Sequence, residues 1–139
     1  MPEIRIAREA GACYGVERAL QMVESAADEQ SGAVHTLGPL IHNPRVVAEL
    51  AEKGVDAVDA PEQAAGDTLL LRTHGTVPAE EARARELCAR VLDATCPFVK
   101  KVHLAAERLS GEGYQVVVVG EAGHPEVEAT LPHAPGAVV

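Results

Sequence analysis

Two cysteines of this chain fall in loops that follow apolar, strand-like segments. Cys13 stands between Gly11 and Gly15, and Cys96 is followed directly by Pro97. Glycine and proline at a loop allow a ligand to approach the backbone closely. A thiolate in such a loop can act as a metal ligand or as a nucleophile, or it can remain a free thiol. Cys13 and Cys96 are therefore candidates for chemistry.

Other patterns narrow the choice of chemistry. The chain has no C-x-x-C pair, which excludes by pattern a zinc ribbon and a thioredoxin-like redox centre. The segment from Cys13 to Arg18 is similar to a cysteine phosphatase loop, but the spacing between Cys and Arg is one residue too short. Neither glycine-rich nucleotide-binding motif is present. Cys88 lies within a predicted helix and is interpreted as an inert packed thiol.

Three histidines, His42, His74 and His124, occupy the same class of loop as the two cysteines. Several of these positions lie at predicted helix starts, where free backbone N–H groups and the helix dipole favour anions. Imidazoles there can donate charge-assisted hydrogen bonds to phosphate oxygens. Glu126 can be a proton-donating carboxyl group or only a favourable partner of the helix dipole. The remaining histidines are interpreted as structural: His35, His103 and His133.

The elements that must position these residues alternate between short strands and helices. Strands are predicted at 3–8, 34–37, 68–72, 91–94 and 115–119. Helices are predicted at 16–30, 44–53, 78–90, 97–110 and 126–131. Asn43 suits the N-cap of the second helix, Pro44 its first position and Gly54 its stop. This order predicts an α/β fold with a parallel sheet flanked by helices and right-handed crossovers.

The alternation of elements also predicts a division of the chain. Residues 1–95 make one complete α/β unit, and residues 96–139 make the first part of a second, similar unit. The unbroken apolar run at 116–119 is expected of a strand that is covered on both faces. In open parallel sheets, ligands bind at the carboxyl ends of the strands. We therefore expect Cys13, His42, His74 and Cys96 to converge at one edge.

Composition excludes some partners. The chain has 139 residues, of which 47% are hydrophobic and 24% charged, and a formal net charge of −9. An acidic chain without a basic face is not expected to bind nucleic acid or an anionic membrane surface. No segment approaches the ~20 apolar residues of a membrane span, and residues 1–5 do not resemble a signal peptide. We expect a cytoplasmic protein, and an anionic small molecule remains a compatible ligand because distant charges are screened.

Five segments together resemble one family, the LytB-type 4-hydroxy-3-methylbut-2-enyl diphosphate reductases of the non-mevalonate isoprenoid pathway. These segments are 11–19, 41–43, 73–75, 93–99 and 123–128. Each is weak alone, but the five follow the family's order and spacing over nearly the whole chain. The resemblance implies reductive dehydroxylation of an allylic diphosphate to isopentenyl and dimethylallyl diphosphate. It implies a [4Fe–4S] cluster with Cys13 and Cys96 as ligands, and an external one-electron donor such as ferredoxin or flavodoxin.

The resemblance also implies roles for the other candidates. His42, His74 and His124 would bind the diphosphate, and Glu126 would help to deliver protons to the leaving hydroxyl group. The family's third cluster cysteine lies beyond the last residue of this chain. We therefore expect the amino-terminal portion of a reductase, inactive by itself. Two alternatives remain open: a non-catalytic diphosphate-binding or interaction module, and a transferase or hydrolase that uses Cys13 as its nucleophile.

Overall fold

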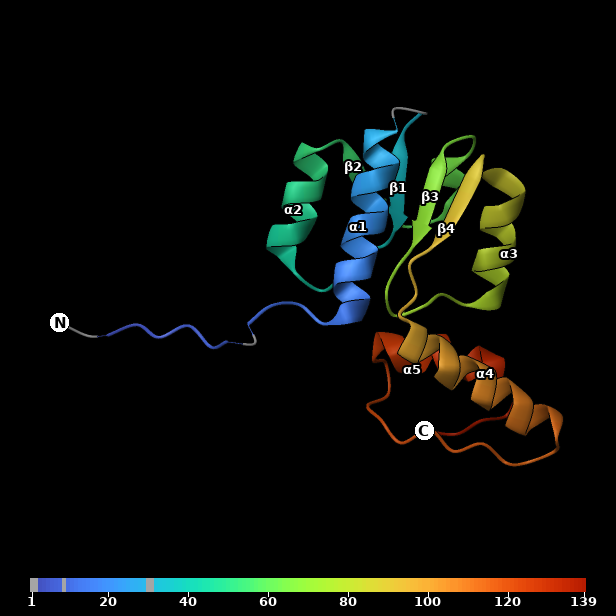
Figure 1. The fold of residues 1–139 in the computed structure, drawn as a ribbon. Helices are drawn as coiled ribbons and strands as arrows, with labels where there is room; N and C mark the ends of the chain where they lie inside the picture. Colours follow the sequence, from blue (N-terminus) through green and yellow to red (C-terminus); the bar gives the residue numbers. More distant parts are fainter. Residues whose placement is uncertain (1–2, 9, 30–31) are drawn as a thin grey trace.

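A computed structural model of the chain describes residues 3–8, 10–29 and 32–139. Figure 1 shows a sheet with helices on both faces and further helical segments beyond one end of its strands. The α-helices are α1 (Tyr14–Asp28), α2 (Pro44–Glu52), α3 (Pro78–Leu87), α4 (Pro97–Gly111) and α5 (Pro125–Thr130). The strands are β1 (Val34–Leu37), β2 (Val55–Val58), β3 (Thr68–Leu71) and β4 (Arg90–Asp93). Two short 3-10 helices are η1 (Pro61–Ala64) and η2 (Leu131–His133). The α/β fold expected from the sequence is confirmed.

The four strands pair in the order β2-β1-β3-β4, and every pairing is parallel. The chain passes from β1 through α2 to β2 on one side, and from β3 through α3 to β4 on the other. The direction of winding therefore reverses between β1 and β3. The carboxyl ends of these two strands form a topological switch point, the place where open α/β sheets bind ligands.

The central strand β3 is covered on both faces. Leu69, Leu70 and Leu71 are at most 1% exposed. Because side chains alternate across a strand, Leu70 packs with α1, α2 and β1 residues on one face. Leu69 and Leu71 pack on the other face against Ala84 of α3 and Ala64 of η1. Burial on both faces holds β3, and hence the loop that follows it, in one position.

The predicted boundaries of α2 are confirmed. Asn43 is the N-cap, and its side chain accepts hydrogen bonds from the backbone N–H groups of Arg45 at 3.1 Å and Val46 at 3.5 Å. Pro44 occupies the first helical position, where its missing N–H is not needed. Gly54 follows the helix with a φ of +80°, a left-handed conformation that glycine adopts without strain. Local chemistry therefore sets where this helix begins and ends.

The amino-terminal segment differs from its prediction. Residues 3–8 form no strand, and Figure 1 shows this segment running away from the sheet. Ile4 and Ile6 are 90% and 84% exposed. Their alternation with polar residues predicts a strand only if a sheet edge accepts it, and no strand of the described residues does so. Helix α1 begins at Tyr14, two residues earlier than predicted, and the predicted helix end at Gln30 lies outside the described residues.

The predicted buried strand at 115–119 is also wrong for the chain as described. The segment makes one isolated parallel bridge, in which Val117 is paired with Val138. The hydrogen bonds of this bridge are Val118 N to Val138 O at 2.8 Å and Val138 N to Val116 O at 3.2 Å. Val119 is 98% exposed. Val116 and Val118 are only partly buried and Val117 is exposed, so the apolar composition does not place this segment in the core.

The remaining differences are one strand that was not predicted and small shifts at element ends. Strand β2 was not predicted, because its sequence Val-Asp-Ala-Val buries only Val55. Helix α3 ends at Leu87 rather than Arg90, so Cys88 lies at the helix C-cap in an extended conformation and not inside the helix. Its thiol is still partly packed against the core cluster on the α3 face of the sheet. The division at residues 95 and 96 stays a prediction. None of the helices in the described ranges has the length and hydropathy of a membrane span.

The two faces of the sheet and the exposed segment give a direct stability test. We expect Leu70→Ala to lower the free energy of unfolding by about 2–5 kcal/mol, because it leaves a cavity at the centre of the core. The matched change Val119→Ala should alter it by less than about 0.5 kcal/mol, as at other exposed positions. Denaturant midpoints of the two variants measure both effects. A loss at Val119 as large as that at Leu70 would contradict the exposed position of Val119.

Candidate active site

Two of the predicted histidines meet at the topological switch point. His42 comes from the loop after β1, and His74 comes from the loop after β3. Their ring centroids lie 4.2 Å apart with an interplanar angle of 31°. His42 is exposed, whereas His74 is half-buried. The structure thus places two hydrogen-bonding imidazoles side by side where this class of sheet binds ligands.

A buried threonine ties together the loops that carry these residues. Thr73 is 6% exposed, and its backbone N–H and its hydroxyl both donate to Leu40 O, at 3.2 Å and 3.0 Å. Its own carbonyl accepts from Cys96 N at 2.9 Å. One series of hydrogen bonds therefore crosses the loops after β1, β3 and β4. The sequence analysis gave Thr73 no role, although it directly precedes His74.

Burial and neighbouring charges set the protonation of His74. Burial lowers the pKa of His74 below its ordinary value of 6.5, and His42 acts in the same direction. Glu126 raises this pKa, but by less than the first two causes lower it. The Nδ1 atom of His74 is buried and has no hydrogen-bond partner among the described residues. The ring is therefore neutral at neutral pH, and a bound anion would favour its protonation.

The amino-terminal end of α5 faces the same region. His124 is the N-cap of α5, and its Nδ1 accepts a hydrogen bond from Glu126 N at 3.3 Å. Because Nδ1 is the acceptor, the proton of the neutral ring lies on Nε2. The charges of His124 and Glu126 both act on His74, and Figure 1 shows α5 beyond the carboxyl ends of the strands. The side chains of both residues are exposed.

The two candidate thiols lie at the starts of long helices. Cys13 is the N-cap of α1 and Cys96 is the N-cap of α4, and neither side chain makes a capping hydrogen bond. Each helix has 15 residues, so its first turn presents free N–H groups and a dipole that favour negative charge. A Cβ atom at Gly15 would stand 2.7 Å from Cys96 Sγ. The absence of a side chain at Gly15 thus allows α1 and Cys96 to approach each other.

Cys88 takes no part in this arrangement. Its Sγ lies 3.9 Å from Pro61 O of η1, on the α3 face of the sheet. Burial raises the pKa of the Cys88 thiol, and the carboxylates of Asp67 and Glu62 act in the same direction. The thiol therefore resists ionisation. This agrees with its interpretation as an inert packed residue.

The donor set fits part of an iron–sulfur site. Thiolates are the ligands that these clusters require, and Cys13 and Cys96 supply two of them. Within residues 3–8, 10–29 and 32–139, no group of three or more Cys, His, Asp or Glu side chains is placed to hold a metal ion. Further ligands would have to come from outside this part of the protein. No described imidazole hydrogen-bonds to the Cys13 thiol, so the nucleophile alternative finds no base there.

Two surface hollows border the site, and they are separate. One, of about 530 Å³, lies beside His42 and is lined mainly by apolar residues of α2 and the loop before it. The other, of about 340 Å³, is lined by His124 and Glu126 together with residues 118–121. Neither hollow includes a cysteine. The described residues therefore form one open wall of a site rather than a closed pocket.

Two arginines at this edge were given no role by the sequence analysis. Arg72 Nε donates to Gly75 O at 3.3 Å, which braces the loop around His74. Arg18 of α1 donates from Nη2 to Asp93 O at 3.2 Å and from Nη1 to Thr95 O at 3.3 Å. Two features of the sequence could have pointed to these arginines. Arg72 is a basic residue at the end of an apolar strand, and Arg18 is a basic residue shortly after Cys13.

These features define a class of protein: a doubly wound parallel α/β protein with paired imidazoles and two thiols at the carboxyl edge of its sheet. The family model described as "LytB protein" matches residues 4–139. This chain belongs to the LytB family.

Individual relatives agree with this assignment. The chain is 48% identical over 135 residues to a 4-hydroxy-3-methylbut-2-enyl diphosphate reductase of Anaeromyxobacter sp. (strain Fw109-5), covering 96% of this chain and 48% of the relative. It is 48% identical over 131 residues to the enzyme of the same name from Aquifex aeolicus (strain VF5), covering 94% and 45%. The chain thus spans about half the length of the curated relatives it matches.

Solved structures show the same fold. A structure of (E)-4-hydroxy-3-methyl-but-2-enyl diphosphate reductase superposes with a TM-score of 0.85 at 46% identity, covering 100% of this chain and 51% of that one. The E-1-hydroxy-2-methyl-but-2-enyl-4-diphosphate reductase of Plasmodium falciparum gives a TM-score of 0.88 at 28% identity, covering 95% and 42%.

The imidazole pair predicts a specific titration behaviour. We expect His74 to titrate below its ordinary value of 6.5, and His42→Ala to move that midpoint upward, because a neighbouring positive charge is removed. The unfolded chain then binds more protons than the folded chain between the two pKa values. Stability attributable to His74 is therefore complete above about 6.5 and falls as pH drops through this window.

The NMR chemical shift of the His74 ring against pH measures this effect. His133→Gln is the matched control, because His133 stacks on His103 at 4.4 Å and lowers the pKa of that residue instead. It should leave the His74 midpoint where it is. An unchanged His74 midpoint in His42→Ala would mean that the two rings do not interact.

Proposed function

We propose that this chain forms part of a 4-hydroxy-3-methylbut-2-enyl diphosphate reductase, and that the switch-point edge binds the substrate's diphosphate. The observation that carries the proposal is the imidazole pair of His42 and His74, 4.2 Å apart at the carboxyl ends of β1 and β3. Membership of the LytB family and the names of its relatives support the same activity. The rest of the site would come from the half of the protein that this chain does not include.

The histidines supply the chemistry that a diphosphate requires. His42, His74 and His124 each present a ring nitrogen that can donate to a phosphate oxygen, and protonation makes that bond charge-assisted. Burial and the neighbouring ring keep His74 neutral in the free chain. A diphosphate oxygen would reverse that balance by favouring the imidazolium form. Binding is therefore coupled to proton uptake.

Cys13 and Cys96 are proposed to hold a [4Fe–4S] cluster together with a third ligand from outside this chain. The free N–H groups of α1 and α4 favour the negative charge that thiolates bring to such a site. When bound, the cluster would supply the electrons that break the allylic C–O bond. An external one-electron donor such as ferredoxin or flavodoxin would provide these electrons to the cluster. Thiolate ligands of this kind need a reducing compartment, which supports a cytoplasmic location.

Glu126 is proposed to deliver a proton to the leaving hydroxyl group. Its side chain is exposed in this chain and lies close enough to affect the charge of His74. A carboxyl group acts well as an acid when it is shielded from water. That shielding would come from the missing half of the site, which explains why we expect no turnover from these 139 residues alone.

A chimeric enzyme tests the reductase activity. This chain replaces the matching 45% of the Aquifex aeolicus relative, and we expect the chimera to reduce 4-hydroxy-3-methylbut-2-enyl diphosphate. Glu126→Gln should lower turnover by about 10²–10⁴-fold, the usual loss of a general acid. Iron and acid-labile sulfide should stay at the level of the parent chimera. Reductase assays and metal analysis on anaerobically purified protein measure both.

Glu128→Gln is the matched control, since Glu128 is exposed on the same short helix. It should turn over like the parent chimera. Near-normal turnover in Glu126→Gln would remove Glu126 from the proton-delivering role. A chimera with full cluster content and no turnover would overturn the proposed activity.

Pyrophosphate binding tests the histidines without the cluster. Calorimetric affinity of the chain for pyrophosphate should be higher near about pH 5.5 than near about pH 8, on either side of the ordinary imidazole value. The His42→Ala, His74→Ala double variant should lose most of this dependence. The dependence that remains in it measures the ionisation of pyrophosphate and the contribution of His124. His35→Ala is the control, because His35 lies in β1 and pairs with Asp67 at 3.5 Å. An equal pH profile in parent and double variant would argue against an anion site.

A further inference from the structure

Arg18 connects helix α1, which begins after Cys13, to the residues that directly precede Cys96. It lies on α1, the helix whose N-cap is Cys13, and is partly buried. Its guanidinium donates to the carbonyl oxygens of Asp93 at 3.2 Å and Thr95 at 3.3 Å. Asp93 is the last residue of β4, and Thr95 directly precedes Cys96. Among the residues that the structure describes, no carboxylate lies within ion-pair distance of Arg18, so these carbonyls are its polar partners.

We propose that Arg18 is a positioning residue that holds Cys96 in a fixed relation to Cys13, so that the two thiols bind one metal centre as a pair. This inference rests on the proposed function, because it assigns Arg18 to the same site. Arg18 does not touch the metal in this account. It acts through the backbone that carries Cys96.

The Cys13 side of this connection is rigid. The carbonyl oxygen of Cys13 accepts the helical hydrogen bond from Glu17 N at 3.0 Å. Arg18 follows in the next turn of the same helix, which packs on the sheet through buried residues such as Ala19 and Val23. The position of Cys13 relative to the Arg18 backbone is therefore set by helix geometry.

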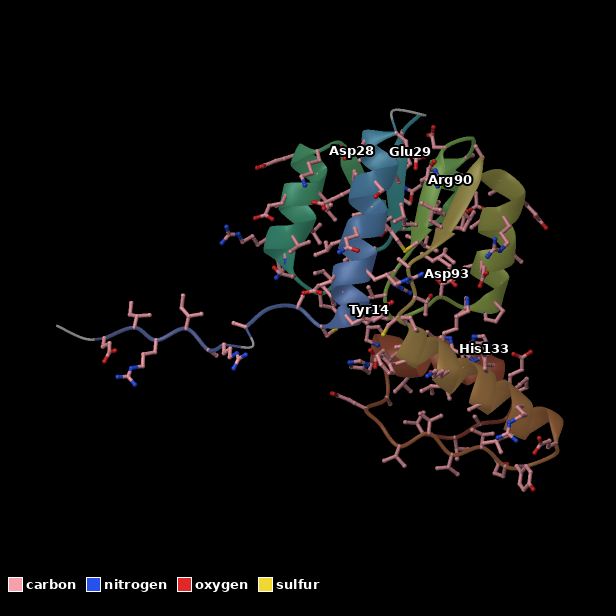
Figure 2. All side chains as sticks on the ribbon, in the orientation of Figure 1. Tyr14, Asp28, Glu29, Arg90, Asp93 and His133 are labelled. Atoms are coloured by element: carbon pink, nitrogen blue, oxygen red, sulfur yellow. The ribbon has the colours of Figure 1, made fainter. Side chains whose placement is uncertain are left out.

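The Cys96 side is rigid within itself. The carboxylate of Asp93 accepts from Thr95 N at 3.0 Å and pairs with Lys100 of α4. Cys96 N donates to Thr73 O at 2.9 Å. These bonds fix the shape of the segment and tie it to β3, but they make no contact with α1. In Figure 2, Tyr14 at the start of α1 and Asp93 at the end of β4 lie at the same end of the sheet.

Arg18 supplies the directional contact between these two rigid parts. Two further contacts are apolar or steric: Ala94 packs in one core cluster with Ala19 and Val23 of α1, and an added Cβ at Gly15 would stand 2.7 Å from the Cys96 Sγ. These contacts set a minimum distance but no orientation. The planar guanidinium donates from two separate nitrogens to two carbonyls, which a lysine ammonium cannot reproduce in the same geometry. The arginine fork therefore sets how the Cys96 segment is turned toward α1.

Cadmium titration tests the pairing of the thiols without the cluster. All variants carry Cys88→Ala, so that Cys13 and Cys96 are the only thiols. Cd²⁺ is added anaerobically, and thiolate-to-metal charge-transfer absorption reports binding. We expect Arg18→Ala to weaken Cd²⁺ binding by about 10–100-fold, the range found when a partner that orients a ligand is removed. Arg18→Lys should restore part of the affinity, and the exposed control Arg45→Ala should bind like the parent.

The readout separates positioning from general stability. A purely structural role would lower the unfolding midpoint of Arg18→Ala without changing the Cd²⁺ affinity of the chain that remains folded, as judged by circular dichroism. Parent affinity in folded Arg18→Ala therefore overturns the inference. If Arg18→Ala does not fold, Arg18→Gln takes its place, because it keeps most of the side-chain length, and the same outcome overturns the inference.

Single cysteine variants separate this inference from the proposed function. Cys13→Ser and Cys96→Ser should each weaken Cd²⁺ binding at least as much as Arg18→Ala. If they do so while Arg18→Ala binds like the parent, the thiol pair stands and only the role of Arg18 fails. If Cys13→Ser binds like the parent, the two thiols do not act together. The cluster assignment in the proposed function then fails as well.

Discussion

The hydrogen bonds of Thr73 are the constraint on which the candidate site depends. Its N–H and hydroxyl both donate to Leu40 O, and its carbonyl accepts from Cys96 N. Thr73 lies two residues after the end of β3, and the leucines of β3 are buried on both faces of the sheet. A threonine held in this way fixes three loops relative to the core. These loops carry His42, His74 and Cys96.

The electrostatics of this edge differ from those of the acidic protein as a whole. The formal net charge of −9 is spread over a surface rich in exposed ion pairs, and its long-range effect is screened. At the switch point, by contrast, burial keeps His74 neutral and leaves its Nδ1 without a described partner. An unsatisfied buried nitrogen costs folding free energy. The proposed anion site therefore depends on local donors rather than on overall charge.

Capping and stop residues predicted helix ends correctly where these residues alone satisfy the backbone at that end. The Asn43 cap and Gly54 stop of α2 were readable because each satisfies a backbone requirement within a few residues. The same kind of reasoning failed for residues 3–8 and 116–119, whose alternating or apolar patterns suggest strands. A strand needs a neighbour to pair with and a layer to cover it. Neither requirement can be read from the segment itself.

The sequence by itself determined which residues follow the strands, and so which side chains could meet at the carboxyl edge. It also determined the α/β class, because strand and helix periodicities alternate along the chain. Only the tertiary structure decided the strand order, the switch point between β1 and β3, and the contacts of Arg18. Arg18 is separated from Asp93 by 75 positions in the sequence and from Thr95 by 77 positions. Such long-range contacts arise from packing of the whole core, and no local pattern encodes them.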